Sequence, residues 1–559
     1  FRTTLFNACF ESCGAYFAES TKKASVYKGL ARRFDRKERI QSMEEHGKSR
    51  HTIWLPDETW NRVKLLYKED NCFSQSEFVE KAIRFYDGYL HTAKSSDFLP
   101  KVLLEVLEGT LGVYGDRLGR LLFKLAVPTV IAQLVNMLYN IVDRIYIGHM
   151  PGDGSAALTG VGVCMPLILI VSAFAAFVAS GGAPRASISM GKGDYDSAEK
   201  ILGGCVLMQV VISAVLTVVL LVFGRDLLLA FGASENTIDY AADYMSIYAI
   251  GTLFVQLTLG LNAFITAQGF AKYGMLTVLI GAAANIVLDP IFIFGFRMGV
   301  RGAALATVIS QGISCIWVIL FLRGGKTVLK LKRENIRFAP RIILPCIALG
   351  LATFIMQASE SVISVCFNSS LLKYGGDIAV GAMTILTSVM QFAMLPLQGV
   401  AQGAQPITSY NFGAGNSARV RESFRLLLTV CLVYSVALWG LVMLFPRIFV
   451  GMFASDTQLI DFASRALRIY CGAMFIFGIQ ISCQMTFVSI GYALCSIIVA
   501  VMRKFVLLIP LIYIMPQLLS DKVSAVYAAE PVADSLAVIF TAVMFAVNFK
   551  KALRKMDEK

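Results

Sequence analysis

Residues 201–223, ILGGCVLMQVVISAVLTVVLLVF, form an apolar run that contains no charged side chain. A helix of about 20 such residues crosses the roughly 30 Å hydrocarbon layer of a bilayer. Similar runs recur from about residue 120 onward, separated by short polar loops. They predict an all-α membrane protein with twelve transmembrane helices, near residues 121–148, 156–184, 201–223, 240–267, 274–296, 302–322, 342–368, 377–407, 424–445, 464–488, 491–516 and 527–548.

The composition of the 559 residues agrees with a lipid bilayer as the surrounding medium. Hydrophobic residues make up 56% and charged residues 16% of the chain, whereas about a quarter of a soluble protein is charged. One set of loops carries roughly 19 basic residues and the opposite set roughly six, which places both termini in the cytoplasm. We find no nucleophile–His–acid set and no phosphate-binding loop, so we expect neither an enzyme nor a cofactor.

The apolar part of the chain repeats itself at an offset of 222 positions. Residues 191–194 recur as 413–416, and three single residues recur in the same way. This repeat predicts two six-helix lobes related by a pseudo-twofold axis along the membrane normal. The expected divisions are an N-terminal lobe (120–323), a cytoplasmic loop (324–341) and a C-terminal lobe with a basic tail (342–559). The three recurring pairs are Tyr248 and Tyr470, Asn262 and Gln484, and Gly269 and Gly491.

Carboxylates inside the predicted helices are the first candidates for function, because a charge at the helix centre costs about 2.5–3.5 kcal/mol. Asn285 and Asp289 lie four residues apart, on one helix face. An amide oxygen and a carboxylate suit Na⁺, and the carboxylate also suits a proton. Asp143 is a candidate second carboxylate of this site, although a structural ion pair with Arg144 is an alternative.

Three further carboxylates lie in or near the predicted helices of the C-terminal half. Glu360 falls within the seventh helix and has three possible roles: binding a cationic substrate, binding a proton, or pairing with Arg503-Lys504. Glu530 and Asp534 stand at the start of the twelfth predicted helix. We interpret these two as a solvated helix end near a membrane surface.

Four segments together resemble the multidrug and toxic compound extrusion (MATE) transporters. They are YNIVDRIYIG (139–148), NIVLDPIF (285–292), GVRGAALAT (299–307) and YNFGAGN (410–416). They occur in the family's order and spacing, and the resemblance covers about residues 120–550. It implies a monomeric antiporter in the bacterial cytoplasmic membrane. Such a protein exports small organic, often cationic, compounds in exchange for Na⁺ or H⁺.

The resemblance also assigns individual residues. It implies a cation-binding and coupling set in the N-terminal lobe, at which Na⁺ is possible, made of Asp143, Asn285, Asp289 and Thr307 with Tyr244 and Asn262 as polar partners. Pro128 matches a first-helix proline whose kink accompanies cation binding in some members. Glu360 matches a seventh-helix glutamate and is a candidate substrate or proton site of the C-terminal lobe.

The N-terminal segment suggests a separate module. We interpret residues 1–49 as a leader that is disordered or not native, 50–95 as a ribbon-helix-helix-like module, and 96–119 as a connector. DNA is a possible partner only through residues 50–93, which gives one alternative function, a membrane-tethered DNA-binding regulator. A second alternative is a lipid-linked oligosaccharide flippase, which predicts basic residues in the cavity instead of Asp143 and Asp289.

Overall fold

The computed structural model describes residues 44–45, 48–49, 118–150, 154–453 and 456–558. Two short strands, β1 (Glu44–Glu45) and β2 (Lys48–Ser49), pair in antiparallel fashion. The chain divides into two units, residues 1–99 and 100–559. The module predicted over 50–95 and most of the leader and connector lie outside the described residues, so the DNA-binding alternative remains a prediction.

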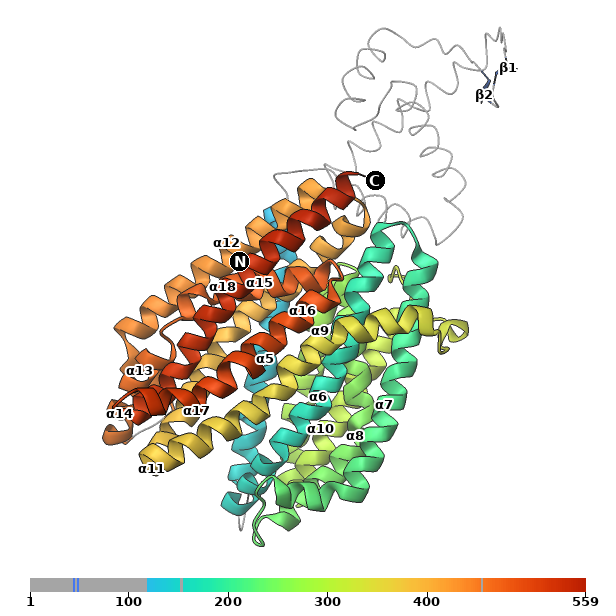
Figure 1. Cartoon of the computed structure of the whole chain (residues 1–559). Helices are drawn as coiled ribbons and strands as arrows, with labels where there is room; N and C mark the ends of the chain where they lie inside the picture. Colours follow the sequence, from blue (N-terminus) through green and yellow to red (C-terminus); the bar gives the residue numbers. More distant parts are fainter. Residues whose placement is uncertain (1–43, 46–47, 50–117, 151–153, 454–455, 559) are drawn as a thin grey trace, which may run out of the picture. The chain divides into compact units, whose positions relative to one another are not determined.

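The described part of the second unit consists of helices joined by turns and loops, and its helices coincide with the predicted apolar runs (Figure 1). The N-terminal lobe contains α5 (Leu118–Gly148), α6 (Gly154–Gly191), α7 (Tyr195–Ala230), α8 (Ile238–Ala267), α9 (Ala271–Pro290) with its π-helical continuation η2 (Ile291–Gly295), and α10 (Val300–Arg323). A loop with a short turn, η3 (Arg333–Asn335), leads to the C-terminal lobe.

The C-terminal lobe repeats this order with more interruptions. Its elements are α11 (Pro340–Gly413), α12 (Ser417–Leu444), α13 (Pro446–Gly451), α14 (Thr457–Tyr470), η4 (Met474–Ile476), α15 (Phe477–Ser489), α16 (Ala493–Val501), the π-helical η5 (Met502–Leu508), α17 (Ile509–Leu518) and α18 (Lys522–Asp557). The described residues contain 10 helices that are long and apolar enough to cross a membrane, and 11 if the bent α14–α15 pair is one span.

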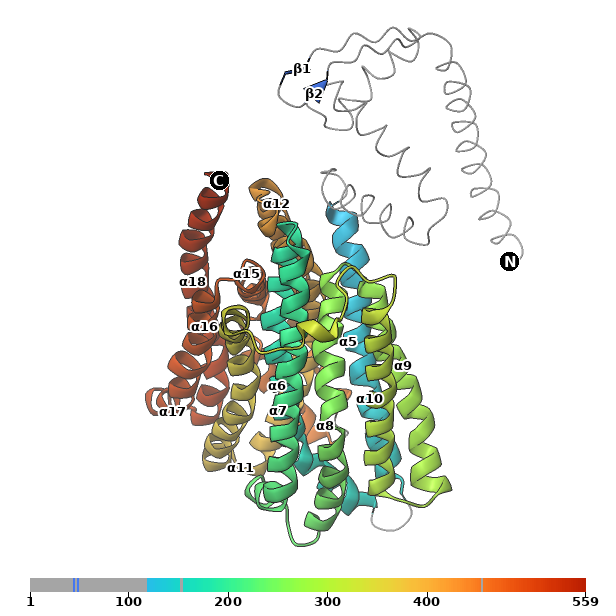
Figure 2. The same ribbon diagram turned by 90° about the vertical axis from the view of Figure 1, so that its right-hand side faces the viewer.

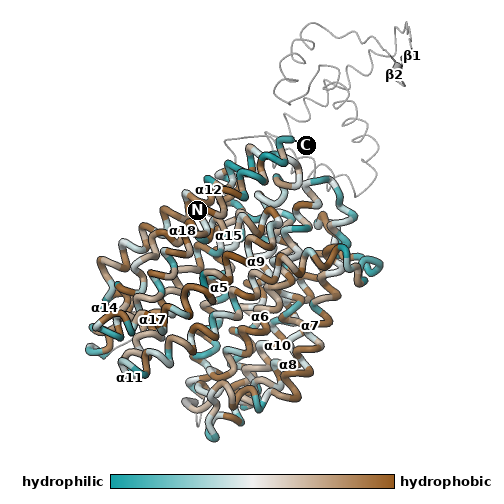
Figure 3. Tube along the Cα trace, viewed as in Figure 1, coloured by the Kyte–Doolittle hydropathy of each residue, from teal (hydrophilic) through white to brown (hydrophobic). Residues whose placement is uncertain are grey.

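The twelfth span comes from a break inside α11. Gly376 has φ 64° and ψ −162°, which is not helical and which a residue with a Cβ adopts only with strain. This break separates the predicted seventh and eighth helices, so the described residues hold the expected twelve spans. Apolar residues cover their middle parts and polar residues gather at their ends (Figure 3).

Matching hydrogen bonds confirm the internal repeat. The Ser187 hydroxyl donates to the Ala267 carbonyl oxygen at 3.0 Å, and its equivalent Ser409 donates to Ser489 at 2.8 Å. The turn before α7 and the turn before α12 are also capped alike: the side chains of Asp194 and Asn416 accept from the backbone N–H three residues later. The two lobes therefore share one topology, and Figures 1 and 2 show them as two groups of helices side by side.

The close contacts between the lobes lie in the half of the helices that leads to the basic loops. The Thr129 hydroxyl of α5 donates to the Gly399 carbonyl oxygen at 2.6 Å, and the Phe174 and Phe354 rings lie 4.7 Å apart. A Cβ on Gly350 would lie 2.0 Å from the Phe177 carbonyl oxygen, so this approach of α11 to α6 requires glycine. Toward the opposite end the lobes diverge (Figure 1).

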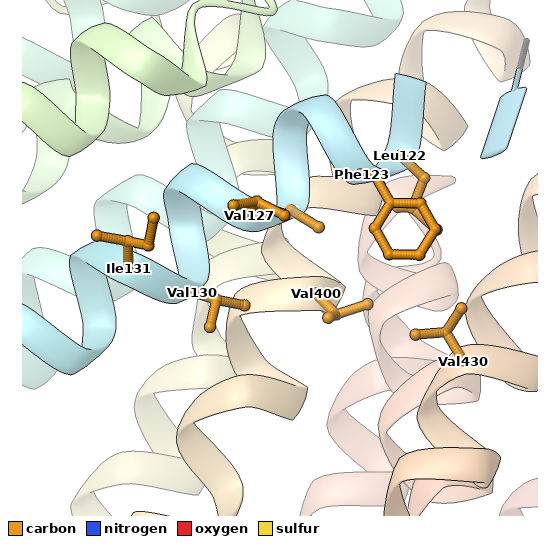
Figure 4. A pocket seen from close by; sticks show the side chains of 8 residues that line it. Leu122, Phe123, Val127, Val130, Ile131, Val400 and Val430 are labelled. Carbon is orange, nitrogen blue, oxygen red and sulfur yellow. The ribbon is translucent and has the colours of Figure 1, made fainter. Parts of the chain in front are cut away.

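A small groove on the seam between the lobes is entirely apolar. Side chains of α5, α11 and α12 line it, among them Val127, Val130, Ile131, Val400 and Val430 (Figure 4). It offers no polar group to orient a charged ligand, so we do not place substrate recognition there.

Candidate functional site

Asp143, Asn285 and Asp289 come together inside the N-terminal lobe. Asp143 lies on the last turns of α5, and Asn285 and Asp289 lie on the last turns of α9, which packs against α5. Their exposed fractions are 9%, 1% and 0%, respectively. The sequence spacing explains the pair on α9, because residues four apart share one face of a helix.

The site contains more acceptors than donors. The Asn285 amide donates to Asp289 Oδ1 at 3.2 Å, and the Asp143 and Asp289 carboxyl groups interact directly. Asp143 Oδ1, Asn285 Oδ1 and Asp289 Oδ2 are buried and have no hydrogen-bond partner among the described residues. Buried oxygens without a partner are uncommon, and a proton or a cation is the kind of group that could satisfy them.

No basic side chain within the described ranges forms an ion pair with these carboxylates. Arg144 is exposed, and its effect on Asp143 is electrostatic and weaker than a salt bridge. The structure therefore does not contain the Asp143–Arg144 ion pair considered above. Two adjacent buried carboxylates without a counter-charge repel each other when both are ionised.

Tyr244 and Thr307 complete the polar surroundings of the site. Tyr244 of α8 is buried, interacts electrostatically with Asp143, and its hydroxyl is hydrogen-bonded to Thr307 of α10. The Tyr244 ring also stacks on Tyr248, with ring centres 6.2 Å apart. Five of the six residues assigned to this set thus occupy one region of the lobe.

Asn262, the sixth residue, lies elsewhere. It is 18 residues beyond Tyr244 on the continuous helix α8, which places it roughly 27 Å away along the helix axis. Its amide donates to the Gly274 carbonyl oxygen at 3.2 Å, and its repeat equivalent Gln484 donates to Ser496 in the same way. Asn262 therefore joins two neighbouring helices, and the prediction that it belongs to the cation site is not supported by its position.

Pro128 lies within α5, which continues as one helix from Leu118 to Gly148. It is buried next to Thr129, whose hydroxyl lies within hydrogen-bonding distance of the carbonyl oxygens of Leu125 and Ala126 in the preceding turn and of Gly399 in the other lobe. Pro128 thus stands where α5 contacts α11, about four turns from Asp143. This position suits a change of helix curvature that is transmitted to the lobe contact.

A polar stripe follows α11 beyond its contact with the N-terminal lobe. Gln357, Glu360, Ser361 and Ser364 recur at helical spacing on one side, and all are at least partly exposed. Lipid does not tolerate such a surface, whereas a water-filled space between the lobes does. The stripe follows Phe354, which packs on Phe174 of α6, so it begins where the lobes separate.

A network of five charged residues occupies the C-terminal lobe. Lys504 Nζ lies 2.7 Å from Glu360 Oε1. Arg503 Nε lies 2.6 Å from Asp534 Oδ1, and Arg503 Nη2 lies 3.3 Å from Glu530 Oε1. Glu530 and Asp534 are buried, 5% and 3% exposed, so their interpretation as a solvated helix end is wrong. They lie two to three turns inside α18, because that helix begins at Lys522.

Pairing of Glu360 with Arg503-Lys504 was one of the three possibilities given above, and the structure shows it through Lys504, whereas the pairs that Arg503 forms with Glu530 and Asp534 were not predicted. Arg503 and Lys504 interrupt an apolar run at its middle, which is the same signal that singled out Asp143 and Glu360. Glu530 and Asp534 have the i, i+4 spacing that places both carboxylates on one helix face. These two signals indicate charged side chains inside both helices, but they do not show that the two helices are neighbours.

Comparison with known proteins identifies the family. The MatE family model matches residues 128–291 and 352–514, one segment in each lobe. A multidrug export protein MepA from Staphylococcus haemolyticus is 25% identical over 354 residues, covering 63% of this chain and 77% of that protein. A MepA from Staphylococcus aureus is 23% identical over 390 residues, covering 70% and 85%.

Solved structures share the fold. A MATE structure in the bent conformation superimposes with a TM-score of 0.74 at 21% identity, covering 80% of this chain and 99% of that chain. A MOP-superfamily transporter from Pyrococcus furiosus, described as having a binding pocket of reversed polarity, gives 0.73 at 22%, covering 79% and 99%. The twelve-helix, two-lobe fold, the two family segments and the curated relatives agree, and the chain belongs to the MatE family.

Proposed function

We propose that the protein is a secondary antiporter that exports organic, chiefly cationic, compounds in exchange for Na⁺ or H⁺. The observation that carries this proposal is the pair of buried carboxylates Asp143 and Asp289, which have no basic partner in the described residues and leave oxygens unpartnered. Such a pair takes up a cation whenever it is accessible to water. The multidrug export proteins among its relatives support a drug-like substrate.

The donor set is compatible with both ions. Carboxylate, amide and hydroxyl oxygens of Asp143, Asp289, Asn285 and Thr307 are the hard ligands that Na⁺ prefers. A proton shared by the two carboxylates would relieve the same charge repulsion, and it would not need the amide oxygen as a ligand. The gradient that drives export identifies the coupling ion.

The lobe contacts suggest how the cycle proceeds. The lobes touch near the basic loops and diverge at the other end, so this state is the outward-facing one if those loops are cytoplasmic. Cation binding at Asp289 neutralises the site and favours release of substrate to the outside. Each inward cation charge gains about 2.3 kcal/mol per 100 mV, which supports about a 50-fold substrate gradient.

The same reasoning gives the protein's setting. We propose that it is a monomer in the bacterial cytoplasmic membrane. We place both termini in the cytoplasm, because the basic residues cluster in the loops of that side. The flippase alternative required a basic cavity. Lys504 and Arg503 do lie in the C-terminal lobe, but three carboxylates pair with them, so we do not favour it.

Efflux of ethidium from proteoliposomes tests the proposal. Na⁺ and pH gradients are imposed separately on wild type, Asp289→Asn and the control Asp461→Asn, whose exposed carboxylate pairs with Arg447 outside the sites. Export should follow one gradient in wild type and in the control. It should be lost in Asp289→Asn, because asparagine mimics the ion-occupied site permanently. Wild-type export that is indifferent to both gradients would refute the antiporter proposal.

A further inference from the structure

The loop between the lobes, residues 323–341, is strongly basic. It carries seven basic residues and one acidic residue, Glu334. Lys332 is paired with Glu199 of α7, at 2.6 Å. Nothing in the part of the chain that the structure describes forms an ion pair with the other six, all of which are exposed: Arg323, Lys326, Lys330, Arg333, Arg337 and Arg341. These six charges therefore suit an anionic partner from outside the protein.

The N-terminal lobe fixes the backbone of this loop. Gln268, at the end of α8, uses its side-chain oxygen to accept hydrogen bonds from the Thr327 hydroxyl and from the two backbone N–H groups that follow, at 2.8–2.9 Å. Glu199 accepts a further hydrogen bond from the Lys330 N–H at 3.1 Å. Leu329, between these anchors, is fully buried. The cationic side chains are thus presented from an ordered backbone, so binding a ligand costs little further ordering.

The loop lies at the depth at which the hydrocarbon layer begins. A Cβ on Gly203 of α7 would lie 2.3 Å from the Asn335 carbonyl oxygen, so the turn η3 rests directly on this helix. Gly203 is the third residue of the apolar run 201–223. The loop also leaves α10 at Arg323 and enters α11 at Pro340, and both are spanning helices. Its exposed cations therefore lie at the level of the lipid headgroups.

Phe338 places an exposed aromatic ring among these cations. Its exposed fraction is 67%; Arg337 precedes it directly, and Arg341 follows on the first turn of α11. A ring held out into water is unfavourable, whereas aromatic and basic residues together are typical of segments that lie in the membrane interface. There the ring enters the boundary of the acyl chains and the cations meet phosphate groups. A free inorganic anion would satisfy the cations but has no apolar part to cover the ring.

We propose that residues 323–341 form a docking surface for the headgroups of acidic phospholipids. The lipid phosphates contact the six exposed cations, and Phe338 enters the boundary of the acyl chains. One part of this surface is bonded to α8 of the N-terminal lobe, and its far end, Arg341, lies on α11 of the C-terminal lobe. A bound lipid therefore lies at the junction of the two lobes. The surface is separate from the candidate ion site, so the inference goes beyond the proposed function and does not depend on it.

Tryptophan fluorescence tests the proposal in the full-length protein. Phe338→Trp places a reporter at the exposed ring, after the native tryptophans are changed to phenylalanine. The protein is reconstituted in equimolar phosphatidylcholine and phosphatidylglycerol, one of which carries brominated chains that quench the tryptophan on contact. Phosphatidylglycerol should be enriched at the reporter at least about fivefold over phosphatidylcholine, because each cation near an acidic surface adds about a fivefold preference. The native tryptophans are Trp54, Trp60, Trp317 and Trp439.

Two pairs of substitutions separate this surface from a general effect of surface charge. Arg337→Gln with Arg341→Gln should lower the enrichment at the reporter at least about fivefold. The control, Arg421→Gln with Arg425→Gln, removes two exposed cations of α12 on the same side of the membrane and should leave the enrichment unchanged. Inorganic phosphate, added at constant ionic strength, should also leave it unchanged.

Spin-labelled phosphatidylglycerol gives a second measurement that keeps the native Phe338. Its motionally restricted fraction should fall in the Arg337→Gln, Arg341→Gln protein and not in the control. Equal quenching by the two lipids, an equal effect of the two pairs of substitutions, or loss of the enrichment in inorganic phosphate would each overturn the inference.

Discussion

Replacing Gly350 by alanine should drive the protein out of the lobe arrangement described here. The new Cβ would lie 2.0 Å from the Phe177 carbonyl oxygen, and real Cβ contacts are not shorter than 3.0 Å. The backbones of α11 and α6 must then separate by about 1 Å, and overpacking of this kind costs about 1–3 kcal/mol. The cost falls on the state in which the lobes touch, so the opposite state should gain about 5- to 150-fold in population.

Double electron–electron resonance between two spin labels measures this change in the populations of the two states. Labels at Lys192→Cys and Arg421→Cys, on exposed positions of the two lobes, report their separation near the basic loops once the native cysteines are replaced. Gly440→Ala is the matched control, because a Cβ there meets nothing within 4 Å. If Gly350→Ala gives the same distance distribution as Gly440→Ala, the glycine contact does not hold the lobes together and our account of the closed side is wrong.

Three other contacts of the described helices lead to predictions of their own. Cys205 of α7 and Cys346 of α11 interact directly, so oxidation should form a disulfide between them. If the lobes separate there during transport, this cross-link should reduce export at least about tenfold. Reduction of the disulfide should restore export. Asn262→Ala and Gln484→Ala should each lower stability by about 1 kcal/mol in thermal melts and leave ion dependence unchanged, because each loses a helix–helix hydrogen bond; altered ion affinity in Asn262→Ala would return that residue to the cation site. Arg503→Met should destabilise the protein by about 3–5 kcal/mol, since it leaves two buried carboxylates unpaired, and a melt like that of wild type would contradict the ion-pair geometry.

The fold was predictable from the sequence almost in full, because a bilayer demands long apolar helices and each span therefore has its own signal. The helices continue beyond those runs, and Asp194 and Asn416 cap α7 and α12 several residues before the apolar segments begin. The bend between α14 and α15, 46°, has no signal in hydropathy. The break at Gly376 lies in the loop expected between the seventh and eighth helices. The sequence does not show that a single non-helical residue forms this break in place of a longer turn.

The candidate site was predictable where the signal is local. Asn285 and Asp289 share a helix face by spacing alone, and the structure adds Asp143 from another helix. Asn262 was misplaced because a family pattern gives the identity of a polar residue and not its depth along the helix. The ion pairs of Arg503 depend on which helices become neighbours, and that is a property of the packed lobe and not of any one segment.

The measurement that tests exchange most directly is the reverse reaction. A gradient of ethidium is imposed across proteoliposomes that contain equal Na⁺ and equal pH on both sides, and the uptake or release of ²²Na⁺ and of protons is followed. The drug gradient should move one of these ions uphill in wild type and in Asp461→Asn, and should move neither in Asp289→Asn. Ethidium movement without movement of either ion in wild type would contradict antiport, because exchange requires the two fluxes to be linked in both directions.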